Sequence, residues 1–296
     1  MQADPWHRFV IWRDRRRRAG KLLHRVRTAD AAVVSAGKSG RTWLRAMVSH
    51  LYHQRYGLPP AELINFDDFN ARHGEIPRIL FSGVKSELRA PSGRTWGQEM
   101  AGIDRIVLLC RDPRDVAVSF YFQLTERATE RELLRKGIPS REALRGMTIC
   151  GFLLDPQLGV PAAHRFVEDW RAALSTHPRT MTVTYEELCA DTAAAFGRVA
   201  RFLDPATTDA EIAGAVAFGD FGAMQAREQQ GFFNSERLRP GGSGAPEGLK
   251  VRRGKIGGYR DYLSAAEIAA VDRLLSVPAA DAAADAPSPA TGSSSG

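Results

Sequence analysis

Short hydrophobic runs recur along the chain, each bounded by polar or turn-forming residues. They lie at Ala31–Val34, Ile79–Phe81, Ile106–Cys110 and Met181–Tyr185. The third run is continuously apolar, which is typical of a strand buried on both faces in a parallel sheet. The fourth alternates with β-branched threonines, as strands often do. These runs predict a central parallel sheet.

Other hydrophobic residues recur at the three- and four-residue spacing of helices. After the first strand they are Trp43, Leu44, Met47, Val48 and Leu51. Further helices are predicted over 126–136, 166–170, 192–203, 209–218 and 265–275. Glycines and prolines predict loops over 151–161 and 227–250. We therefore expect an α/β fold in which helices flank one parallel sheet.

The composition divides the chain of 296 residues into three parts. Residues 1–29 form a basic segment with interspersed aromatics, and residues 30–276 are long enough for a single globular domain. Residues 277–296 are rich in alanine, proline, glycine and serine, so we expect a disordered tail.

The formal net charge of +7 favours an anionic partner. Nucleic acid, an anionic membrane and a polyanionic nucleotide all meet that requirement, so charge alone does not choose between them. The basic segment carries the run Arg15–Arg18 after the aromatics Trp6 and Phe9. One interpretation is a solvated basic helix packed on the domain, and the other is a surface helix attracted to anionic lipid.

Three cysteines, Cys110, Cys150 and Cys189, are widely separated in the chain. This odd and sparse number argues against a disulfide framework and a cysteine-rich metal site, and it favours a reducing compartment such as the cytoplasm. No hydrophobic run approaches the ~18 residues that suggest a transmembrane helix. The polar N-terminus lacks the hydrophobic segment of a secretory signal.

The residues between the first strand and its helix form a tight polar turn, 35–42. A strand, a glycine-bearing turn and a helix in this order aim unpaired backbone N–H groups at an anion. Lys38 and Arg41 add positive charge, while Ser39 and Thr42 add hydroxyl donors. We interpret the turn as a phosphate-binding loop, with a plain connection between strand and helix as the alternative.

A second candidate anion site follows the third strand. Arg111 stands at the carboxyl end of that strand, which is the usual ligand edge of a parallel sheet. Pro113 can begin a helix with Asp112 as its cap, and Ser119 then lies two turns along, on the face toward that edge. An arginine and a hydroxyl can bind one phosphate together. A helix cap with surface ion pairs is the alternative interpretation.

These motifs resemble the sulfotransferase family, whose members use 3′-phosphoadenosine 5′-phosphosulfate (PAPS) as sulfuryl donor. The family's 5′-phosphosulfate loop, Lys-Ser-Gly-x-Thr-Trp, is matched by Lys38, Ser39, Gly40, Thr42 and Trp43. Arg41 replaces a small polar residue that is usual there. The 3′-phosphate signature, Arg-x-Pro-x-Asp-Val-x-x-Ser-x-Tyr, is matched at Arg111 and Ser119. The resemblance implies a P-loop-like nucleotide-binding topology.

Two further segments extend the resemblance over about residues 30–264. Tyr185 begins a Tyr-Glu-Glu-Leu segment similar to one whose tyrosine contacts adenine, and Trp43 and Phe221 match the aromatics that flank that ring. Core packing is the alternative role for each aromatic. The basic segment 249–260 resembles one that closes over the 3′-phosphate, and positions 258–260 depart from its pattern. The donor-binding residues implied in this segment are Arg252, Arg253 and Gly254.

Sulfuryl transfer needs positive charge at the bridging oxygen of the leaving bisphosphate and a base for the acceptor. Lys38 is expected to supply the charge. In the family's small-molecule branch the base is a histidine after the second strand. One alignment places Glu87 there, as in a branch that uses glutamate, and another places Gly83 there and leaves no base. His73, in the preceding loop, is a third candidate.

The resemblance therefore implies sulfuryl transfer from PAPS to a hydroxyl or amine of a small-molecule, lipid or carbohydrate acceptor, with Lys38 and Glu87 as catalytic residues. Neither a metal nor a nucleic-acid partner is expected. A nucleotide or nucleoside kinase is one rival, although Ala32 stands where its phosphate loop needs a first glycine. A non-catalytic anion-binding module is the other rival, because the base stays open. Residues 123–165 and 227–250 are expected to decide the acceptor.

Overall fold

The structure is a computed structural model, and it describes residues 5–235, 238 and 254–276. Within these residues the sheet consists of β1 (Ala31–Ser35), β2 (Ile79–Ser82), β3 (Arg105–Cys110) and β4 (Thr180–Thr184). The strands lie in the order β2-β1-β3-β4, and each neighbouring pair is parallel. The predicted parallel sheet is confirmed.

The register of the sheet brings the carboxyl ends of the two central strands together. Ala31 pairs with Arg105 and Ser35 pairs with Leu109, so β1 and β3 end at the same edge. The chain goes from β1 to β2 on one side and then returns to β3 on the other side, which puts a topological switch point between β1 and β3. Such a point is where open parallel sheets bind their ligands.

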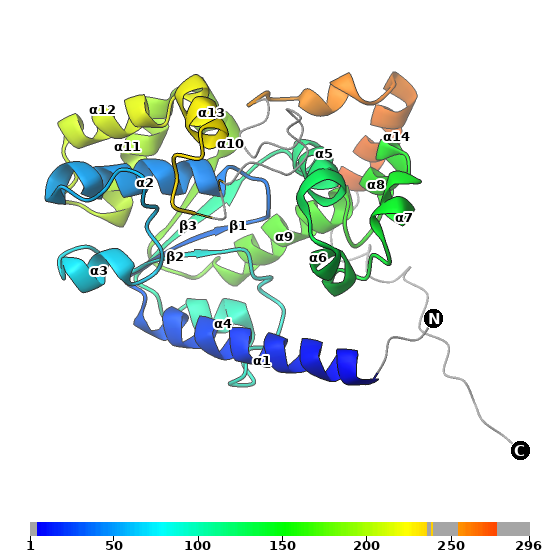
Figure 1. Ribbon diagram of the computed structural model, residues 1–296, viewed down its shortest axis with the longest axis horizontal. Coiled ribbons are helices and arrows are strands. Elements are labelled where there is room, and N and C mark those ends of the chain that lie inside the picture. Colours follow the sequence, from blue (N-terminus) through cyan, green and yellow to red (C-terminus); the bar gives the residue numbers. More distant parts are fainter. Residues whose placement is uncertain (1–4, 236–237, 239–253, 277–296) are drawn as a thin grey trace, which may run out of the picture.

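Helices surround the sheet on both faces and at its carboxyl edge (Figure 1). Before β3 lie α1 (Pro5–Thr28), α2 (Arg41–Tyr56), α3 (Asp68–Arg72) and α4 (Trp96–Met100). Between β3 and β4 lie α5 (Pro113–Phe122), the π-helix η1 (Gln123–Arg127), α6 (Glu130–Arg135), α7 (Arg141–Arg145), α8 (Ile149–Leu154) and α9 (Val160–Ala173). After β4 lie α10 (Tyr185–Ala190), α11 (Thr192–Leu203), α12 (Asp209–Phe218), α13 (Phe221–Gln229), the 3₁₀-helix η4 (Gly258–Asp261) and α14 (Ala265–Leu275).

Alternate residues of the strands face two separate hydrophobic layers. On one side, Val33 and Val107 pack with buried residues of α2, α11 and α12. On the other side, Val34 and Leu108 pack with buried residues of α1, α4 and α9. Figure 1 shows α2, α11 and α12 above the sheet and α1 and α4 below it. Burial on both faces explains why the central strands are apolar at nearly every position.

The region predicted as loop over 151–161 instead contains α8 and the start of α9. Phe152 and Leu153 are fully buried in a third hydrophobic cluster with residues of α5 and α14, and this burial stabilises the helix. Pro161 lies in the first turn of α9, where its missing N–H has no intrahelical partner to lose. The helix predicted at 166–170 therefore begins earlier, at Val160.

Two other element boundaries differ from the prediction. The helix predicted over 126–136 is divided, because η1 ends at Arg127 and α6 begins after its cap, Thr129. Helix α13 continues to Gln229, inside the predicted 227–250 loop, and residues 236–237 and 239–250 of that loop lie outside the described residues. The helices predicted over 192–203, 209–218 and 265–275 are confirmed as α11, α12 and α14.

The basic N-terminal segment forms helix α1, which lies along the lower side of the domain in Figure 1. Val26 is buried, and Ala19, Leu22 and Leu23 pack against the same hydrophobic cluster. These spacings place the four residues on one helical face. The charged run Arg16–Arg18 is exposed. The C-terminal half of α1 is thus the packed helix of the first interpretation, and the predicted tail 277–296 lies outside the described residues.

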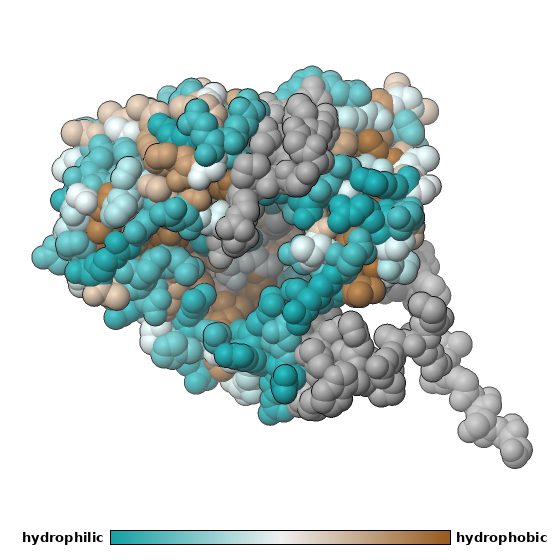
Figure 2. Space-filling model, viewed as in Figure 1, coloured by the Kyte–Doolittle hydropathy of each residue, from teal (hydrophilic) through white to brown (hydrophobic). Residues whose placement is uncertain are grey.

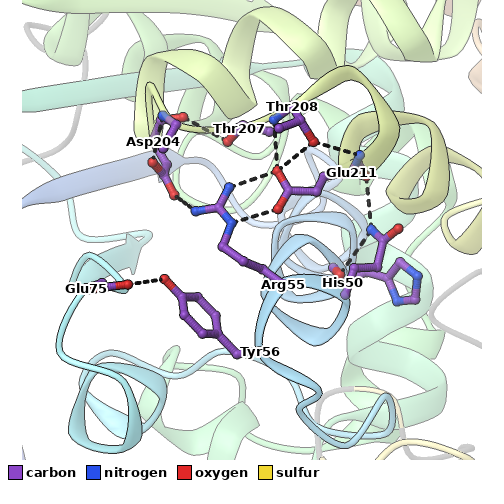
Figure 3. A network of polar contacts seen from close by, with 10 residues as sticks. His50, Arg55, Tyr56, Glu75, Asp204, Thr207, Thr208 and Glu211 are labelled. Carbon is purple, nitrogen blue, oxygen red and sulfur yellow. Dashed lines mark hydrogen bonds and ion pairs between the residues drawn. The ribbon is translucent and has the colours of Figure 1, made fainter.

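A polar network fixes the end of α2 against α11 and α12 (Figure 3). Arg55 donates from Nε and Nη2 to the carboxylate oxygens of Glu211 at 2.6 and 2.9 Å, and from Nη1 to Asp204 at 2.8 Å. The hydrogen bond from Arg55 lowers the pKa of Glu211 to about 2, so this carboxylate stays ionised. Because α2 begins at the edge where β1 ends, the network also sets the direction of the helix that follows the 35–42 turn.

Candidate active site

The turn between β1 and α2 has the backbone geometry of an anion site. Lys38 has a φ of 73° and Gly40 a φ of 88°, and left-handed residues within a turn arrange successive N–H groups around a concavity. Gly40 is the N-cap of α2 and makes no side-chain cap, so the first N–H groups of this 16-residue helix are not satisfied by the cap. The helix N-terminus therefore favours an anion at the turn.

Close packing at the turn requires glycine at position 40. A Cβ atom there would lie 2.7 Å from Cδ2 of Tyr185, and the positive φ would strain any other residue. Tyr185 is buried at the first position of α10, which Thr184 caps, so β4 ends one residue before the predicted boundary. Burial raises the pKa of Tyr185 well above its ordinary value, and the phenol stays protonated.

Arg111 joins the turn to the carboxyl end of β3. It donates from Nη1 to the Lys38 carbonyl and from Nη2 to the Lys255 carbonyl, each at 3.2 Å. Its guanidinium carbon lies 4.1 Å from the centroid of the Tyr185 ring. Its Nε is buried with no hydrogen-bond partner among the described residues. The two cationic features predicted from the sequence therefore meet at one edge of the sheet, and a buried donor there suits an anionic ligand.

Asp115 is a site residue that sequence reasoning missed. Its buried carboxylate, on α5, accepts hydrogen bonds from the N–H groups of Gly257 at 2.8 Å and Tyr259 at 3.0 Å. It also lies 3.7 Å from Arg111. Asp115 therefore holds the 254–260 segment beside Arg111. The signal that could have found it is the acidic position of the Arg-x-Pro-x-Asp motif, because a buried carboxylate needs donors.

The turn, Arg111 and the 254–260 segment line one cavity of about 660 Å³. Its wall includes most of the predicted donor-site residues, namely Lys38, Gly40, Arg41, Thr42, Trp43, Arg111, Ser119, Tyr185, Phe221 and Gly254. Ser39 is buried in the turn and is not part of this wall. Arg252 and Arg253 lie outside the described residues. Figure 2 shows the molecule hollowed near the centre of the view, with hydrophobic residues at the bottom of the hollow.

Trp43, Tyr185 and Phe221 are among the aromatic residues that line the cavity. Trp43 donates from Nε1 to the Gly219 carbonyl at 2.6 Å, and its ring meets that of Tyr185 edge to face, with the ring centroids 5.8 Å apart. Phe221, at the start of α13, remains 39% exposed. A Cβ atom on Gly254 would lie 2.6 Å from the Phe221 ring. Core packing alone does not explain Phe221, because a core residue would be covered.

Arg41 reaches toward the ends of two strands. Its Nη1 donates to the carbonyl groups of Ser35 at 3.0 Å and Ser82 at 2.5 Å, which are the last residues of β1 and β2. Gly83 leaves room for this arrangement, because a Cβ atom there would lie 2.6 Å from Nη1. The guanidinium thus fixes a positive charge in the cavity wall beside Gly83.

Lys38 extends from the turn to the start of η1. Its Nζ donates to Oε1 of Gln123 at 3.3 Å, and Gln123 lines the cavity. Turns of π-helix often mark functional sites. Gln123 was missed because a glutamine in an irregular stretch carries no motif. Nearby, burial raises the pKa of the Cys189 thiol, so this cavity residue stays neutral.

The predicted bases do not border this cavity. Glu87 lies in an exposed turn after β2 and is not part of the cavity wall. The ring of His73 stacks on that of Tyr56, the last residue of α2, with centroids 4.6 Å apart. The length of α2, about 24 Å for its 16 residues, separates His73 from the turn. His73 is therefore excluded as the base, while Glu87 stays a prediction from the sequence.

The described residues contain neither a candidate membrane-spanning helix nor a candidate metal cluster. None of the helices that the structure describes is both long and apolar enough to cross a membrane. In the same part of the chain, no group of three or more histidine, cysteine, aspartate or glutamate side chains is arranged to hold a metal ion.

Comparison with known sequences identifies relatives of this chain. A model of the sulfotransferase domain matches residues 28–281. Cytosolic sulfotransferase 12 of Arabidopsis thaliana is 26% identical over 272 residues, which cover 84% of this chain and 77% of that protein. Cytosolic sulfotransferase 13 of the same plant is 24% identical over 264 residues, which cover 81% of this chain and 73% of that protein.

Solved structures share the fold. Mouse sulfotransferase SULT7A1 complexed with PAP superposes with a TM-score of 0.55 at 18% identity, covering 83% of this chain and 82% of its own. Retinol dehydratase in complex with androsterone and the inactive cofactor PAP has a TM-score of 0.56 at 17% identity, covering 88% and 82%. The predicted α/β fold of the P-loop-like type is thus confirmed. Because the domain model matches most of its length, the chain belongs to the sulfotransferase family, a family of transferase enzymes.

Proposed function

We propose that this protein transfers a sulfuryl group from PAPS to a hydroxyl or amine group of a small apolar molecule. The observation that carries the proposal is the hydrogen bond of 3.2 Å from Arg111 Nη1 to the Lys38 carbonyl. Through this contact the N-terminus of α2 and the second cationic site, Arg111, lie close enough for one nucleotide to reach both. Membership of the sulfotransferase family supports the reaction class.

The two anionic ends of the donor match the two cationic features of the cavity. The N–H groups of the turn suit the 5′-phosphosulfate, because a helix N-terminus attracts an anion. Arg111 and Ser119 suit the 3′-phosphate, since a guanidinium and a hydroxyl bind phosphate oxygens together. The sequence resemblance adds Ser39, Thr42, Arg252, Arg253 and Gly254 to these contacts. Trp43, Tyr185 and Phe221 are proposed to hold the adenine, where stacking contributes about 1–3 kcal/mol.

Lys38 is the proposed electrostatic catalyst. Negative charge grows on the bridging oxygen as its bond to sulfur breaks, and a cationic donor held there lowers the barrier. The Lys38 ammonium is already directed into the cavity, where Gln123 accepts its hydrogen bond. Arg41 adds a second positive charge in the same wall, held in place by two strand-end carbonyl groups. Glu87 is the base predicted from the sequence.

The cavity wall favours an apolar acceptor. Val118, Phe120, Met224 and Tyr262 line it and present mainly hydrocarbon surface. Cavities lined in this way bind apolar small molecules and use a few polar groups for orientation. The retinol dehydratase structure, which is described in complex with androsterone, supports an acceptor of this kind. We therefore favour a small apolar molecule or lipid over a carbohydrate.

We further propose a cytoplasmic protein whose α1 contacts anionic membrane surfaces. The names of the cytosolic relatives support the compartment. The exposed Arg16–Arg18 run lies on the helix whose opposite face packs on the domain. Sedimentation with phosphatidylserine vesicles should capture the protein at low salt, and neutral phosphatidylcholine vesicles should not. Equal capture by both would contradict the electrostatic contact.

Calorimetry with adenosine 3′,5′-bisphosphate (PAP) and with ATP tests the donor class. We expect PAP to bind and ATP to bind far more weakly, because ATP lacks the 3′-phosphate. Arg111→Gln should weaken PAP binding by about tenfold to a hundredfold, since a hydrogen bond to a charged group contributes about 1.5–3 kcal/mol. Arg171→Gln, which removes an exposed ion pair with Glu168, is the control.

The outcomes separate the rival functions. Tighter binding of ATP than of PAP, together with magnesium-dependent turnover of ATP, would support the rival kinase function. Binding of PAP without transfer from PAPS to any acceptor, water included, would indicate an anion-binding module. Unchanged PAP affinity in Arg111→Gln would contradict the proposed placement of the 3′-phosphate.

A further inference from the structure

The cavity wall differs from that of an enzyme that uses a general base. The acceptor must lose a proton during transfer, and a histidine or carboxylate usually takes it. The described part of the wall contains no histidine and no glutamate. Its two aspartates are engaged, because Asp115 accepts main-chain N–H groups of the 254–260 segment and Asp220 caps α13. Glu87 is exposed and lies outside this wall. The geometry therefore favours a route in which no side chain takes the proton.

Arg41 fixes a positive charge in the same wall. Its Nη2 lies 3.1 Å from the point that a Cβ atom of residue 83 would occupy, so the guanidinium stands where a side chain at Gly83 would begin. One alignment places the base of the family at this position. The carbonyl groups of Ser35 and Ser82 hold the guanidinium there. A charge that is held in place before the reaction begins needs no reorganisation, which is when it stabilises an oxyanion most.

Lys38 and Arg41 belong to one turn, but their side chains reach different elements. Lys38 Nζ donates to Gln123 in η1, whereas Arg41 Nη1 donates to the carbonyl groups that end β1 and β2. Transfer between two oxygens places negative charge on the entering oxygen and on the leaving one. Two cations directed to different parts of one cavity suit these two oxygens, with Lys38 at the leaving oxygen and Arg41 at the entering one.

We propose that Arg41 is a catalytic residue that stabilises the ionised oxygen of the acceptor, an assignment that rests on the proposed function. The acceptor hydroxyl loses its proton to water, and the guanidinium favours the resulting oxyanion. That oxygen forms its bond to sulfur while the bond from sulfur to the bridging oxygen breaks. PAP leaves with the electron pair, stabilised by Lys38. The preferred acceptor is therefore an acidic hydroxyl, such as that of a phenol or an enol, and not an ordinary alcohol.

The pKa of 4-nitrophenol bound to the complex with PAP tests the charge without turnover, because the phenolate is coloured and the phenol is not. On binding to the wild type this pKa should fall by about 1–3 pH units, the effect of an opposite charge at 4–6 Å. Arg41→Lys keeps a charge and should keep part of the fall, whereas Arg41→Met should lose it. Arg179→Met is the matched control, since it removes an exposed ion pair with Asp104 at the edge of the sheet where β3 and β4 begin.

Transfer from PAPS to 4-nitrophenol, 4-cyanophenol and 2-chloro-4-nitrophenol gives a second measurement. The kcat/KM of the wild type should rise with pH to a midpoint that follows the pKa of each phenol, because the acceptor itself ionises. A base on the protein would instead give one midpoint for all three. Arg41→Met should lower kcat/KM by about 100- to 1,000-fold, the usual loss when one oxyanion donor is removed. Calorimetry with PAP shows that each variant still binds the donor product.

Each contrary outcome overturns the assignment. A single pH midpoint for all three phenols would indicate a base on the protein, and a loss in Glu87→Gln would then return that role to Glu87. An unchanged pKa of bound 4-nitrophenol, or an equal fall in Arg41→Met, would leave Arg41 as a brace between strand ends. Failure of the PAP complex to bind millimolar 4-nitrophenol would exclude an oxyanion site.

Calorimetry with PAP keeps this assignment apart from the proposed function. Retained PAP binding with a failed Arg41 test removes only the role of Arg41. Absent PAP binding by the wild type removes the proposed function itself.

Discussion

A methyl group at position 83 tests how Arg41 is held at the ends of β1 and β2. In Gly83→Ala the new Cβ would lie 2.6 Å from Arg41 Nη1 and 3.1 Å from Nη2. The backbone at Gly83 is not left-handed, so alanine itself fits the local conformation. The flexible Arg41 side chain must therefore move, which takes it away from the Ser35 and Ser82 carbonyl groups.

The lost hydrogen bonds determine the size of the effect. A hydrogen bond from a charged donor contributes about 1.5–3 kcal/mol, and the movement breaks at least one of the two that Nη1 makes. Replacing glycine with alanine also raises the free energy of unfolding by about 0.4–1 kcal/mol, because alanine restricts the conformations of the unfolded chain. We expect Gly83→Ala to lower the free energy of unfolding by about 1–2 kcal/mol.

Urea unfolding of the wild type, Gly83→Ala, Arg41→Met and the double variant gives a double-mutant cycle. Once Arg41 is replaced, the clash is gone, so Gly83→Ala should be neutral or stabilising by up to about 1 kcal/mol. The effect of the methyl group should thus change sign between the two backgrounds. The same loss of stability in both backgrounds would refute the reasoning, because Gly83 would then not act through Arg41.

Two further predictions concern stability. Arg55→Met should destabilise the fold by about 3 kcal/mol in thermal unfolding, since it leaves the half-buried carboxylates of Asp204 and Glu211 without their partner. The control, Arg198→Met, removes an exposed ion pair with Glu187 and should cost less than about 1 kcal/mol in the same assay. Burial lowers the pKa of His53 from 6.5 to about 4, so the unfolded chain binds its proton first as the pH falls. The contribution of His53 to the free energy of unfolding should be full above pH 6.5 and decline by up to about 3 kcal/mol as the pH falls toward 4. Urea unfolding midpoints of the wild type and of His53→Gln, measured across this pH range, test the expectation. An equally steep fall of the midpoint with pH in His53→Gln would contradict this origin.

The elements that could be predicted are those whose signals are local. Helices α11, α12 and α14 each begin at a side-chain cap and carry apolar residues at helical spacing, so the sequence marks both their existence and their bounds. Helix α8 could not be predicted in the same way. Its Phe152 is stabilised by contacts with the rings of Phe120 and Tyr121, some thirty residues earlier in the chain. Glycines and prolines around it conceal that long-range burial.

The residues of the candidate site also differ in whether a local sequence signal marks them. Lys38 and Arg111 directly follow or flank strand ends, and a parallel sheet brings such residues to one edge. Asp115 and Gln123 depend on partners 142 and 85 residues away along the chain, which no local pattern indicates. The Glu87 prediction depended on the path of a loop after β2, and an alignment does not fix that path.

The attachment of the 254–260 segment explains how its sequence can depart from the family pattern. Asp115 accepts hydrogen bonds from the main-chain amides of residues 257 and 259, and not from their side chains. Apart from the left-handed backbone of Gly257, any residue other than proline supplies the same amide. The hydrogen bonds to Asp115 therefore do not depend on which side chains stand at 258–260. Side chains in this segment can therefore change in evolution while its attachment to α5 is kept.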